Sequence, residues 1–170
     1  MTAAEQQQIF NQWLGQYKAL IFKVVRAYTT AAADRDDLFQ DVCLQLWRSV
    51  PSFRAESAVS TWIYRIAIRT ALTWQGREQR QRKRAQQYAA GQPVLQSPQQ
   101  PEDERLVWLY EEIRKMDEID RSLALLLLDG FSYKEMSKLL GISESNVGVK
   151  IFRIKKRLTQ RAAQLTNDGI

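Results

Sequence analysis

The sequence has no histidine and only one cysteine, Cys43, among its 170 residues. These absences exclude an internal disulfide, a cysteine-histidine zinc site and acid-base catalysis by histidine. Cys43 falls on an apolar helix face, which favours a small buried hydrophobe over a reactive thiol. The sequence shows no nucleophile-base pair and no cluster of metal ligands, so we expect no catalytic residue, no cofactor and no metal site.

Long apolar runs are also missing. The segment "LALLLL" at 123–128 is far shorter than the roughly 20 apolar residues of a membrane span. The start, "MTAAEQQQIF", lacks the basic region and apolar stretch of a secretion signal. We therefore expect no membrane insertion, and the single cysteine fits a reducing, cytoplasmic location.

Prolines are few, and three of the four lie in one glutamine-rich stretch, "GQPVLQSPQQP" at 91–101. The absence of helical or strand period there predicts a linker over 85–101, between a domain at 1–84 and a domain at 102–170. If extended at about 3.1 Å per residue, this linker reaches roughly 50 Å, or roughly 15 base pairs of duplex DNA.

Before the linker, apolar residues at three-and-four spacing predict three helices. The first covers 6–30. The second begins with Asp34 as its N-cap and stops at Pro51. The third follows "PSFRAES" at 51–57 and carries separate apolar and basic stripes. Lysine and arginine outnumber aspartate and glutamate by 25 to 19 in the whole chain, which favours a polyanionic partner.

After the linker, an acidic amphipathic helix precedes a short apolar one, for which Asp117 is the expected cap and Gly130 the left-handed stop. A further helix should begin at the cap Ser132 and end at Gly141. No alternating pattern predicts a strand anywhere. The predicted fold is all-α, with two small helical domains joined by a flexible linker.

The stretch "SYKEMSKLLGISESNVGVKIFRIKK" has the layout of a helix-turn-helix, in which Gly141 makes the turn and Ser143 caps the second helix. Ser137 is small where the two helices would cross. The residues expected between the helices are Met136, Leu140, Ile142, Val147 and Ile151.

The outward side of that second helix has residue types that read or hold DNA. Asparagine, lysine and arginine make bidentate contacts to base edges, and a basic tail suits phosphates. A helical hairpin with a solvated basic end is the plain alternative. The expected DNA-binding residues are Ser143, Glu144, Ser145, Asn146, Val149, Lys150, Arg153, Lys155, Lys156 and Arg157.

Aromatic residues near arginines in the first domain are typical of single-stranded nucleic-acid binding. Trp62 and Trp74 lie on the apolar stripe and are expected in the core. Phe53 and Tyr64 stay candidates for stacking on bases.

In these stretches, and in their order along the chain, the sequence resembles a bacterial RNA polymerase sigma factor of the sigma-70 family, in the small extracytoplasmic-function (ECF) subfamily. "DRDDLFQDVCLQLWRSVPSFRAES" is similar to region two, "STWIYRIAIRTAL" to the helix that reads the minus-ten element, and "DGFSYKEMSKLLGISESNVGVKIFRIKKRL" to region four. The resemblance implies a non-catalytic factor that binds core polymerase and directs promoter-specific initiation.

The resemblance also implies roles for individual residues. An acidic and apolar surface would meet the coiled coil of the polymerase's largest subunit through Asp36, Asp37, Gln40, Asp41 and Leu44. The minus-ten element would be bound by Arg54, Ala55, Glu56, Ser57, Arg65, Arg69 and Thr73, the first four in a loop that accepts a flipped base.

The region-four helix from Ser143 to Arg153 would then enter the major groove at the minus-thirty-five element. The partners expected are core RNA polymerase, through its largest-subunit coiled coil and its flap, promoter DNA, and an anti-sigma factor. The alternatives are a stand-alone helix-turn-helix regulator, which binds its site without polymerase, and a helical adaptor with no nucleic-acid role, which should show no steep salt dependence toward DNA.

Overall fold

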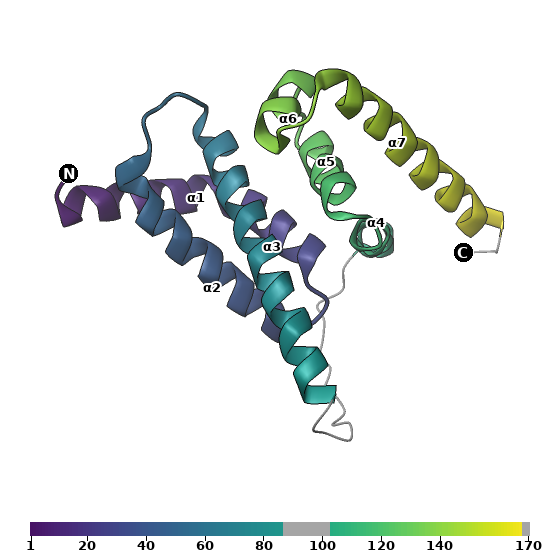
Figure 1. Ribbon diagram of the computed structural model, residues 1–170, viewed down its shortest axis with the longest axis horizontal. Coiled ribbons are helices and arrows are strands. Elements are labelled where there is room, and N and C mark those ends of the chain that lie inside the picture. The colour runs from purple at the N-terminus through teal and green to yellow at the C-terminus, as the bar shows by residue number, and fades with distance from the viewer. Residues whose placement is uncertain (87–102, 168–170) are drawn as a thin grey trace. The chain divides into compact units, whose positions relative to one another are not determined.

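The computed structural model describes residues 1–86 and 103–167, with side chains over 1–81 and 103–164, and these residues are helical apart from short turns (Figure 1). The chain divides into two compact units, Met1–Glu102 and Asp103–Ile170. No strand occurs in the described ranges. The predicted all-α class, with two helical parts separated by a linker, is confirmed.

The first unit contains α1 (Ala3–Tyr28), α2 (Ala32–Ser49), the short 3-10 helix η1 (Val50–Ser52) and α3 (Val59–Gln86). Each of the three long helices packs against the other two. The last helix continues two residues into the predicted linker, because residues 85 and 86 belong to α3. The remaining linker residues lie outside the described part of the chain.

The start of α2 corrects one prediction. Its N-cap is Ala31, with an extended backbone and no side-chain hydrogen bond, and Asp34 lies inside the first turn. An aspartate stabilises a helix either as a cap or within the first turn, where it faces the positive end of the helix dipole. The residue type therefore marks the start of the helix only to within one turn.

The core of the first unit forms where the apolar stripes of its helices meet. Tyr64 is fully buried, so the expectation that its ring stacks on bases is wrong. Trp74 is buried as predicted, and Trp62 is half-buried with its indole N–H 3.2 Å from the Ser49 hydroxyl. Phe53 packs edge-on against Trp13, with ring centres 5.2 Å apart.

The second unit contains α4 (Glu104–Arg114), α5 (Glu118–Leu128), α6 (Tyr133–Leu140) and α7 (Glu144–Asn167). The central helix is α5, which packs against α4, α6 and α7. Six consecutive residues of α5 are buried, from Arg121 to Leu126. A helix that is buried on every side in its middle turns has to be almost wholly apolar, which explains the run of leucines.

Arg121 is the charged exception in this buried segment. One terminal nitrogen of its guanidinium donates to the carbonyl oxygens of Arg114, at 2.8 Å, and Met116, at 3.0 Å. These carbonyls belong to the end of α4 and the turn after it, where a cation is favoured by the helix dipole. Arg121 therefore joins α4 to the beginning of α5.

The predicted helix-turn-helix is present in α6 and α7. Ser132 caps α6 in a capping box with Glu135, and Gly141 ends that helix with φ of 70°. The Ser137 hydroxyl donates to the Ile142 carbonyl at 2.6 Å, and the Ser143 hydroxyl accepts from the Asn146 N–H at 3.1 Å. The apolar residues buried between the helices include Met136, Val147 and Ile151, as predicted.

The buried carboxylate of Glu112, on α4, binds Arg161 in the C-terminal part of α7. Glu112 accepts hydrogen bonds from Lys115 at 2.7 Å and from Arg161 at 3.3 and 3.4 Å. Its side chain is only 2% exposed. Burial by itself raises the pKa of Glu112, but the hydrogen bonds and charges of Lys115 and Arg161 outweigh burial and lower it.

None of the described helices is long and apolar enough to span a bilayer. Across 1–81 and 103–164, no three histidine, cysteine, aspartate or glutamate side chains gather in a way that would hold a metal ion. Cys43 is half-buried, and burial raises the pKa of its thiol.

We predict that Gly141→Ala destabilises the second unit by roughly 1–2 kcal/mol, because alanine is strained at the φ of 70° found there. The control is Gly15→Ala, within α1, where an added Cβ meets no atom within 4 Å. That change should stabilise the first unit by about 0.5–1 kcal/mol. Hydrogen exchange of peptides from α1 and α6 measures both changes in stability. If both substitutions changed stability in the same direction, the left-handed conformation of Gly141 would not explain the effect.

Glu112→Gln should destabilise the second unit at pH 7 by about 1–3 kcal/mol, because the carboxylate hydrogen bonds are charge-assisted. The ordinary pKa of a glutamate carboxyl is 4.5, and folding lowers the pKa of Glu112. Such a carboxyl stabilises the folded state at pH values above 4.5, and this stabilisation is lost as the pH falls through the folded pKa. The wild type and the variant should therefore converge in acid. Thermal unfolding from pH 7 to pH 3 tests this, with the exposed neighbour Glu111→Gln as the control.

Candidate functional site

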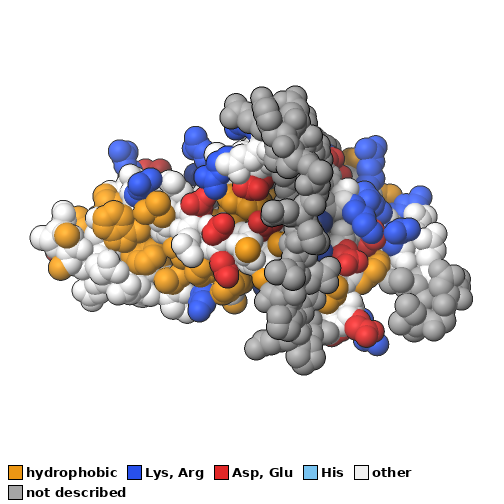
Figure 2. Space-filling model, turned by 90° about the horizontal axis from the view of Figure 1, so that it is seen from below, with side chains coloured by type: hydrophobic (Ala, Val, Ile, Leu, Met, Phe, Trp, Pro, Cys, Tyr) orange, Lys and Arg blue, Asp and Glu red, His pale blue; other side chains and the backbone are white. Residues whose placement is uncertain are grey.

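The outward face of α2 carries most of the residues predicted to bind polymerase. Asp36, Asp37, Gln40 and Leu44 are all exposed, and Leu44 keeps 45% of its surface accessible. Figure 2 shows hydrophobic and acidic side chains next to one another on one face of the first unit. A mixed apolar and acidic surface of this kind suits a basic partner with apolar contacts.

Asp41 lies four residues after Asp37 and three before Leu44, on the same side of this helix and at its edge toward α3. Its carboxylate lies 3.1 Å from a terminal guanidinium nitrogen of Arg77, on α3. The two side chains are 38% and 53% exposed. Asp41 therefore lies at the α3 edge of the same acidic surface, where it pairs with Arg77.

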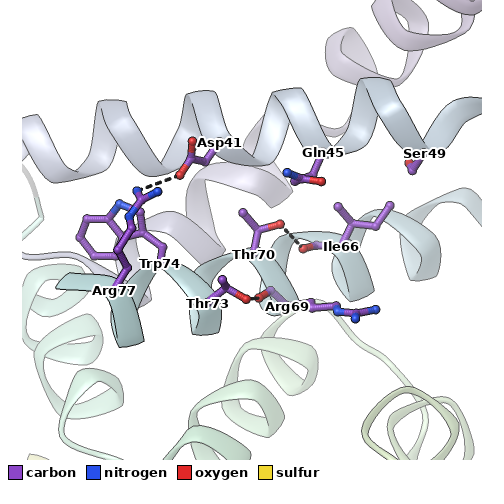
Figure 3. A pocket seen from close by; sticks show the side chains of 9 residues that line it. All are labelled: Asp41, Gln45, Ser49, Ile66, Arg69, Thr70, Thr73, Trp74 and Arg77. Carbon is purple, nitrogen blue, oxygen red and sulfur yellow. Dashed lines mark hydrogen bonds and ion pairs between the residues drawn. The ribbon is translucent and has the colours of Figure 1, made fainter. Parts of the chain in front are cut away.

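A groove of about 490 Å³ lies between α2 and α3 (Figure 3). Two of the predicted minus-ten residues, Arg69 and Thr73, line it together with Asp41 and Arg77. The Thr73 hydroxyl donates to the Arg69 carbonyl at 3.0 Å, so its proton is already used within the helix. Arg65 is exposed on α3, one turn before Arg69.

The loop before α3 holds the other predicted minus-ten residues. Arg54, Ala55 and Glu56 are exposed, and Ser57 is half-buried. Ala55 has φ of 56°, the one positive value at a non-glycine residue in the described ranges. A non-glycine residue in this left-handed region costs of order 1–3 kcal/mol and is held there by its surroundings. The loop is thus kept in an uncommon conformation.

The outer side of α7 presents nearly all of the predicted base and phosphate contacts. The exposed ones are Ser143, Glu144, Ser145, Asn146, Val149, Arg153, Lys155, Lys156 and Arg157. The opposite side, with Val147, Ile151 and Ile154, is buried in the unit. The helix therefore faces solvent with a mainly polar and basic side that also includes the apolar Val149.

Lys150 is the exception on α7. Its ammonium group lies 2.7 Å from a carboxylate oxygen of Asp120, on α5, and the two side chains are only 24% and 26% exposed. The hydrogen bond to Asp120 raises the pKa of Lys150. The sequence predicted a base-reading lysine, but in the structure this side chain links α7 to α5.

Two family models match the chain. The model described as "Sigma-70 region 2" matches residues 13–81, and the model described as "Sigma-70, region 4" matches residues 106–158. The chain belongs to the sigma-70 family of RNA polymerase sigma factors. The region-two match covers most of the first unit, which a stand-alone helix-turn-helix regulator or a helical adaptor does not require, and both alternatives are set aside.

Relatives and solved structures agree with this assignment. The sigma factor is 29% identical over 169 residues to the ECF RNA polymerase sigma-E factor of Haemophilus influenzae, with 92% of this chain and 88% of that protein covered. It binds RNA polymerase, directs promoter recognition and is not itself catalytic.

Two solved structures have the same fold. One is the sigma factor RpoE of Bartonella quintana in complex with the anti-sigma factor NepR, with a TM-score of 0.70, 19% identity, and 90% and 96% of the two chains covered. The other is CnrH in complex with the cytosolic domain of CnrY, with a TM-score of 0.66, 21% identity, and 98% and 96% covered.

Sequence reasoning about the sigma factor missed two exposed aromatic residues. Phe152, on α7, is 68% exposed and lies near Val149, which is 47% exposed. Trp47, on α2, is 37% exposed and lies one turn after Leu44. Both belong to helices whose apolar residues recur at three-and-four spacing, so their exposure to solvent is known from the structure and not from the sequence pattern.

We predict that Lys150→Met lowers the stability of the second unit of the sigma factor by roughly 0.5–1 kcal/mol, because it removes the ion pair with Asp120. Lys155→Met, an exposed lysine on the same helix, should change stability by less than about 0.5 kcal/mol. Amide exchange measured by NMR in α5 and α7 compares them. A larger loss of stability in Lys155→Met than in Lys150→Met would contradict a stabilising role for the ion pair between Lys150 and Asp120.

Proposed function

We propose that this ECF sigma factor divides its work among three exposed surfaces. Residues 1–84 form a region-two domain that binds core polymerase through α2 and the minus-ten element through α3 and the loop before it. Residues 102–170 form a region-four domain that reads the minus-thirty-five element, and 85–101 is the linker. The observation that carries this proposal is that the contact residues lie on faces pointing away from the two cores.

The polymerase surface consists of Asp36, Asp37, Gln40, Asp41 and Leu44, and we add Trp47 to it. The carboxylates offer charge complementarity to a basic coiled coil, which speeds association and fixes register. Leu44 and Trp47 supply apolar area, and a half-exposed tryptophan is the type of side chain that dominates binding energy in interfaces.

The minus-ten surface combines the loop Arg54 to Ser57 with Arg65 and Arg69. Flipping a base out of the stack costs a few kcal/mol, so a loop already fixed in its bound form reduces the ordering cost of binding. The positive φ of Ala55 supports such a fixed loop. The arginines on α3 hold the sugar-phosphate backbone beside it.

The minus-thirty-five surface is the exposed strip of α7. Asn146 and Arg153 have the donors that pair with adenine and guanine edges, and Val149 and Phe152 offer apolar contact to a thymine methyl. The basic residues Lys155, Lys156 and Arg157 face the phosphates. Because Lys150 pairs with Asp120, we assign it a structural role and not a base contact.

Binding to core polymerase bears on where the sigma factor works and on how it is regulated. A factor that binds core polymerase works in the cytoplasm, and we propose that location for this chain. One solved structure of the same fold is a complex with an anti-sigma factor, and the other is a complex with the cytosolic domain of a second protein. We therefore include an anti-sigma factor among the proposed partners, and such a protein would cover the exposed apolar side chains Leu44 and Trp47.

Run-off transcription with purified core polymerase and a promoter library, with and without the protein, tests the proposed function. Transcripts that depend on the protein are expected. A folded sample that supports none with active polymerase would contradict the proposal, and binding of duplex DNA in the absence of polymerase would favour an independent regulator.

Arg153→Ala should weaken minus-thirty-five recognition by about 1–3 kcal/mol at one base position, because a bidentate base contact is lost. Binding to core polymerase should stay unchanged. The matched control is Arg157→Ala, which should weaken binding to all sequences alike by removing a phosphate contact. Holoenzyme binding to single-substituted promoter duplexes measures both, and an equal loss of core binding would contradict the assignment of Arg153.

A further inference from the structure

The ion pair between Lys150 and Asp120 lies beside the proposed base-reading residues of α7. Lys150 comes four residues after Asn146 and three before Arg153, so the three side chains share one edge of the helix. Asn146 and Arg153 are exposed, whereas the Lys150 side chain is only 24% exposed and its ammonium group lies 2.7 Å from the Asp120 carboxylate. The reading surface therefore contains a lysine whose charge is bound within the protein.

The position of the carboxylate is set by helix α5. Asp120 lies in the first turn of this helix, where its backbone N–H donates to the side chain of the N-cap Asp117 at 2.8 Å. Helix α5 packs against α7 over the central part of the unit. The aspartate side chain is short, whereas lysine carries its charge on a flexible four-carbon stem. The ammonium group is therefore the member of the pair that is free to choose between Asp120 and DNA.

The charges around the pair favour the bond to Asp120. The hydrogen bond to Asp120 is the main cause that raises the pKa of Lys150, and the charges of Asp120 and Asp117 add to it. Burial and the positive charge of Arg153 oppose this rise. Because the pKa is raised, Lys150 is an ammonium ion wherever DNA binding is measured. The repulsion from Arg153 also means that the ammonium is better placed on the carboxylate than beside that arginine.

Moving Lys150 from Asp120 to a DNA strand would cost more than the hydrogen bond. The bond joins an ammonium to a carboxylate at 2.7 Å, so it is charge-assisted. Without Lys150, the carboxylate would face the phosphates uncompensated, in a helix turn that also holds Asp117 and Glu118. A new contact to an exposed phosphate is weakened by salt, whereas a partly buried pair is screened less. The balance therefore keeps the lysine on Asp120.

We propose that Asp120 is a positioning residue that withholds Lys150 from promoter DNA, so that the minus-thirty-five element is read without this lysine. The inference rests on the proposed function of α7 and deepens it, because a residue of α5 that does not touch DNA then determines which donors of α7 do. Phosphate contacts carry no sequence information. By binding Lys150, Asp120 limits the affinity of α7 for DNA of any sequence and leaves recognition to Asn146 and Arg153.

The direction of one change in affinity separates withholding from simple stabilisation of the fold. If the pair only stabilises the second unit, Asp120→Ala weakens DNA binding or leaves it unchanged. If Asp120 withholds Lys150, Asp120→Ala strengthens binding about two- to fivefold, the range of an exposed ion pair. It also steepens the slope of log affinity against log salt by about 0.9, the value of one phosphate contact. The measurement uses holoenzyme made with the full chain and a fluorescent promoter duplex recovered by run-off transcription.

A double-mutant cycle with Lys150→Met shows whether the gain belongs to this lysine. Lys150→Met alone should change promoter binding by less than about twofold, because the lysine does not touch DNA in the wild type. Added to Asp120→Ala, it should abolish the gain in affinity and restore the wild-type salt slope. If Lys150→Met alone weakens promoter binding more than this, or if the gain of Asp120→Ala persists without the lysine, the inference is overturned while the proposed function stands.

The matched control is Glu118→Ala, which removes the same charge from an exposed position in the same turn of α5 and leaves the pair intact. Its effect on DNA binding should be smaller than that of Asp120→Ala and should not depend on Lys150. Equal effects of the two substitutions would overturn the inference, because the total charge alone would then explain the gain.

Two further outcomes are distinguishable. A Lys150-dependent gain confined to duplexes with guanine at one position supports the proposal and shows that the freed ammonium reaches a base edge. If Asp120→Ala does not fold, Asp120→Asn, of the same size without the charge, takes its place in the cycle, and no Lys150-dependent gain overturns the inference. If the wild-type protein directs no transcripts from active core polymerase, the proposed function itself fails.

Discussion

The structure of both units depends on one constraint: a helix in a small bundle can bury only one stripe, and every other face must remain compatible with water. In the first unit α2 buries Leu38, Val42 and Leu46 and keeps its acidic and apolar outer side free. In the second unit α7 does the same with Val147, Ile151 and Ile154. The cores therefore decide which faces are left for polymerase and promoter.

Charged side chains add a second level of order to these packed helices. Arg121 joins α4 to α5, Lys150 joins α5 to α7, and Glu112 joins α4 to the later part of α7. Each pairs groups from different helices, so each fixes an angle that apolar contact alone leaves adjustable. The orientation of the exposed strip of α7 is consequently set from both ends.

Local signals in the sequence predicted the helices and turns well. Gly130 and Gly141, with Asp117 and Ser132, mark helix ends because each acts within its own turn of chain. Pairs between residues far apart in the chain could not be predicted in this way. Asp41 and Arg77 are 36 residues apart, and Lys150 and Asp120 are 30 apart, so their contact depends on how the helices pack. The error on Tyr64 is of another kind, because the buried Ile68 and Ala71 lie four and seven residues further along α3 and share its helix face.

Because α7 is long, the contact between Arg161 and Glu112 affects the position of residues far from it along the helix. Arg161 and Asn146 are 15 residues apart, which is about 22 Å along a helix axis. If the helix moves as a rigid rod, a tilt of about 5° at the Glu112 end displaces the Asn146 end by roughly 2 Å, a large part of the spacing of about 3.4 Å between base pairs. Helix α7 is therefore a lever arm, in which a small change at the Glu112 end is enlarged at the Asn146 end.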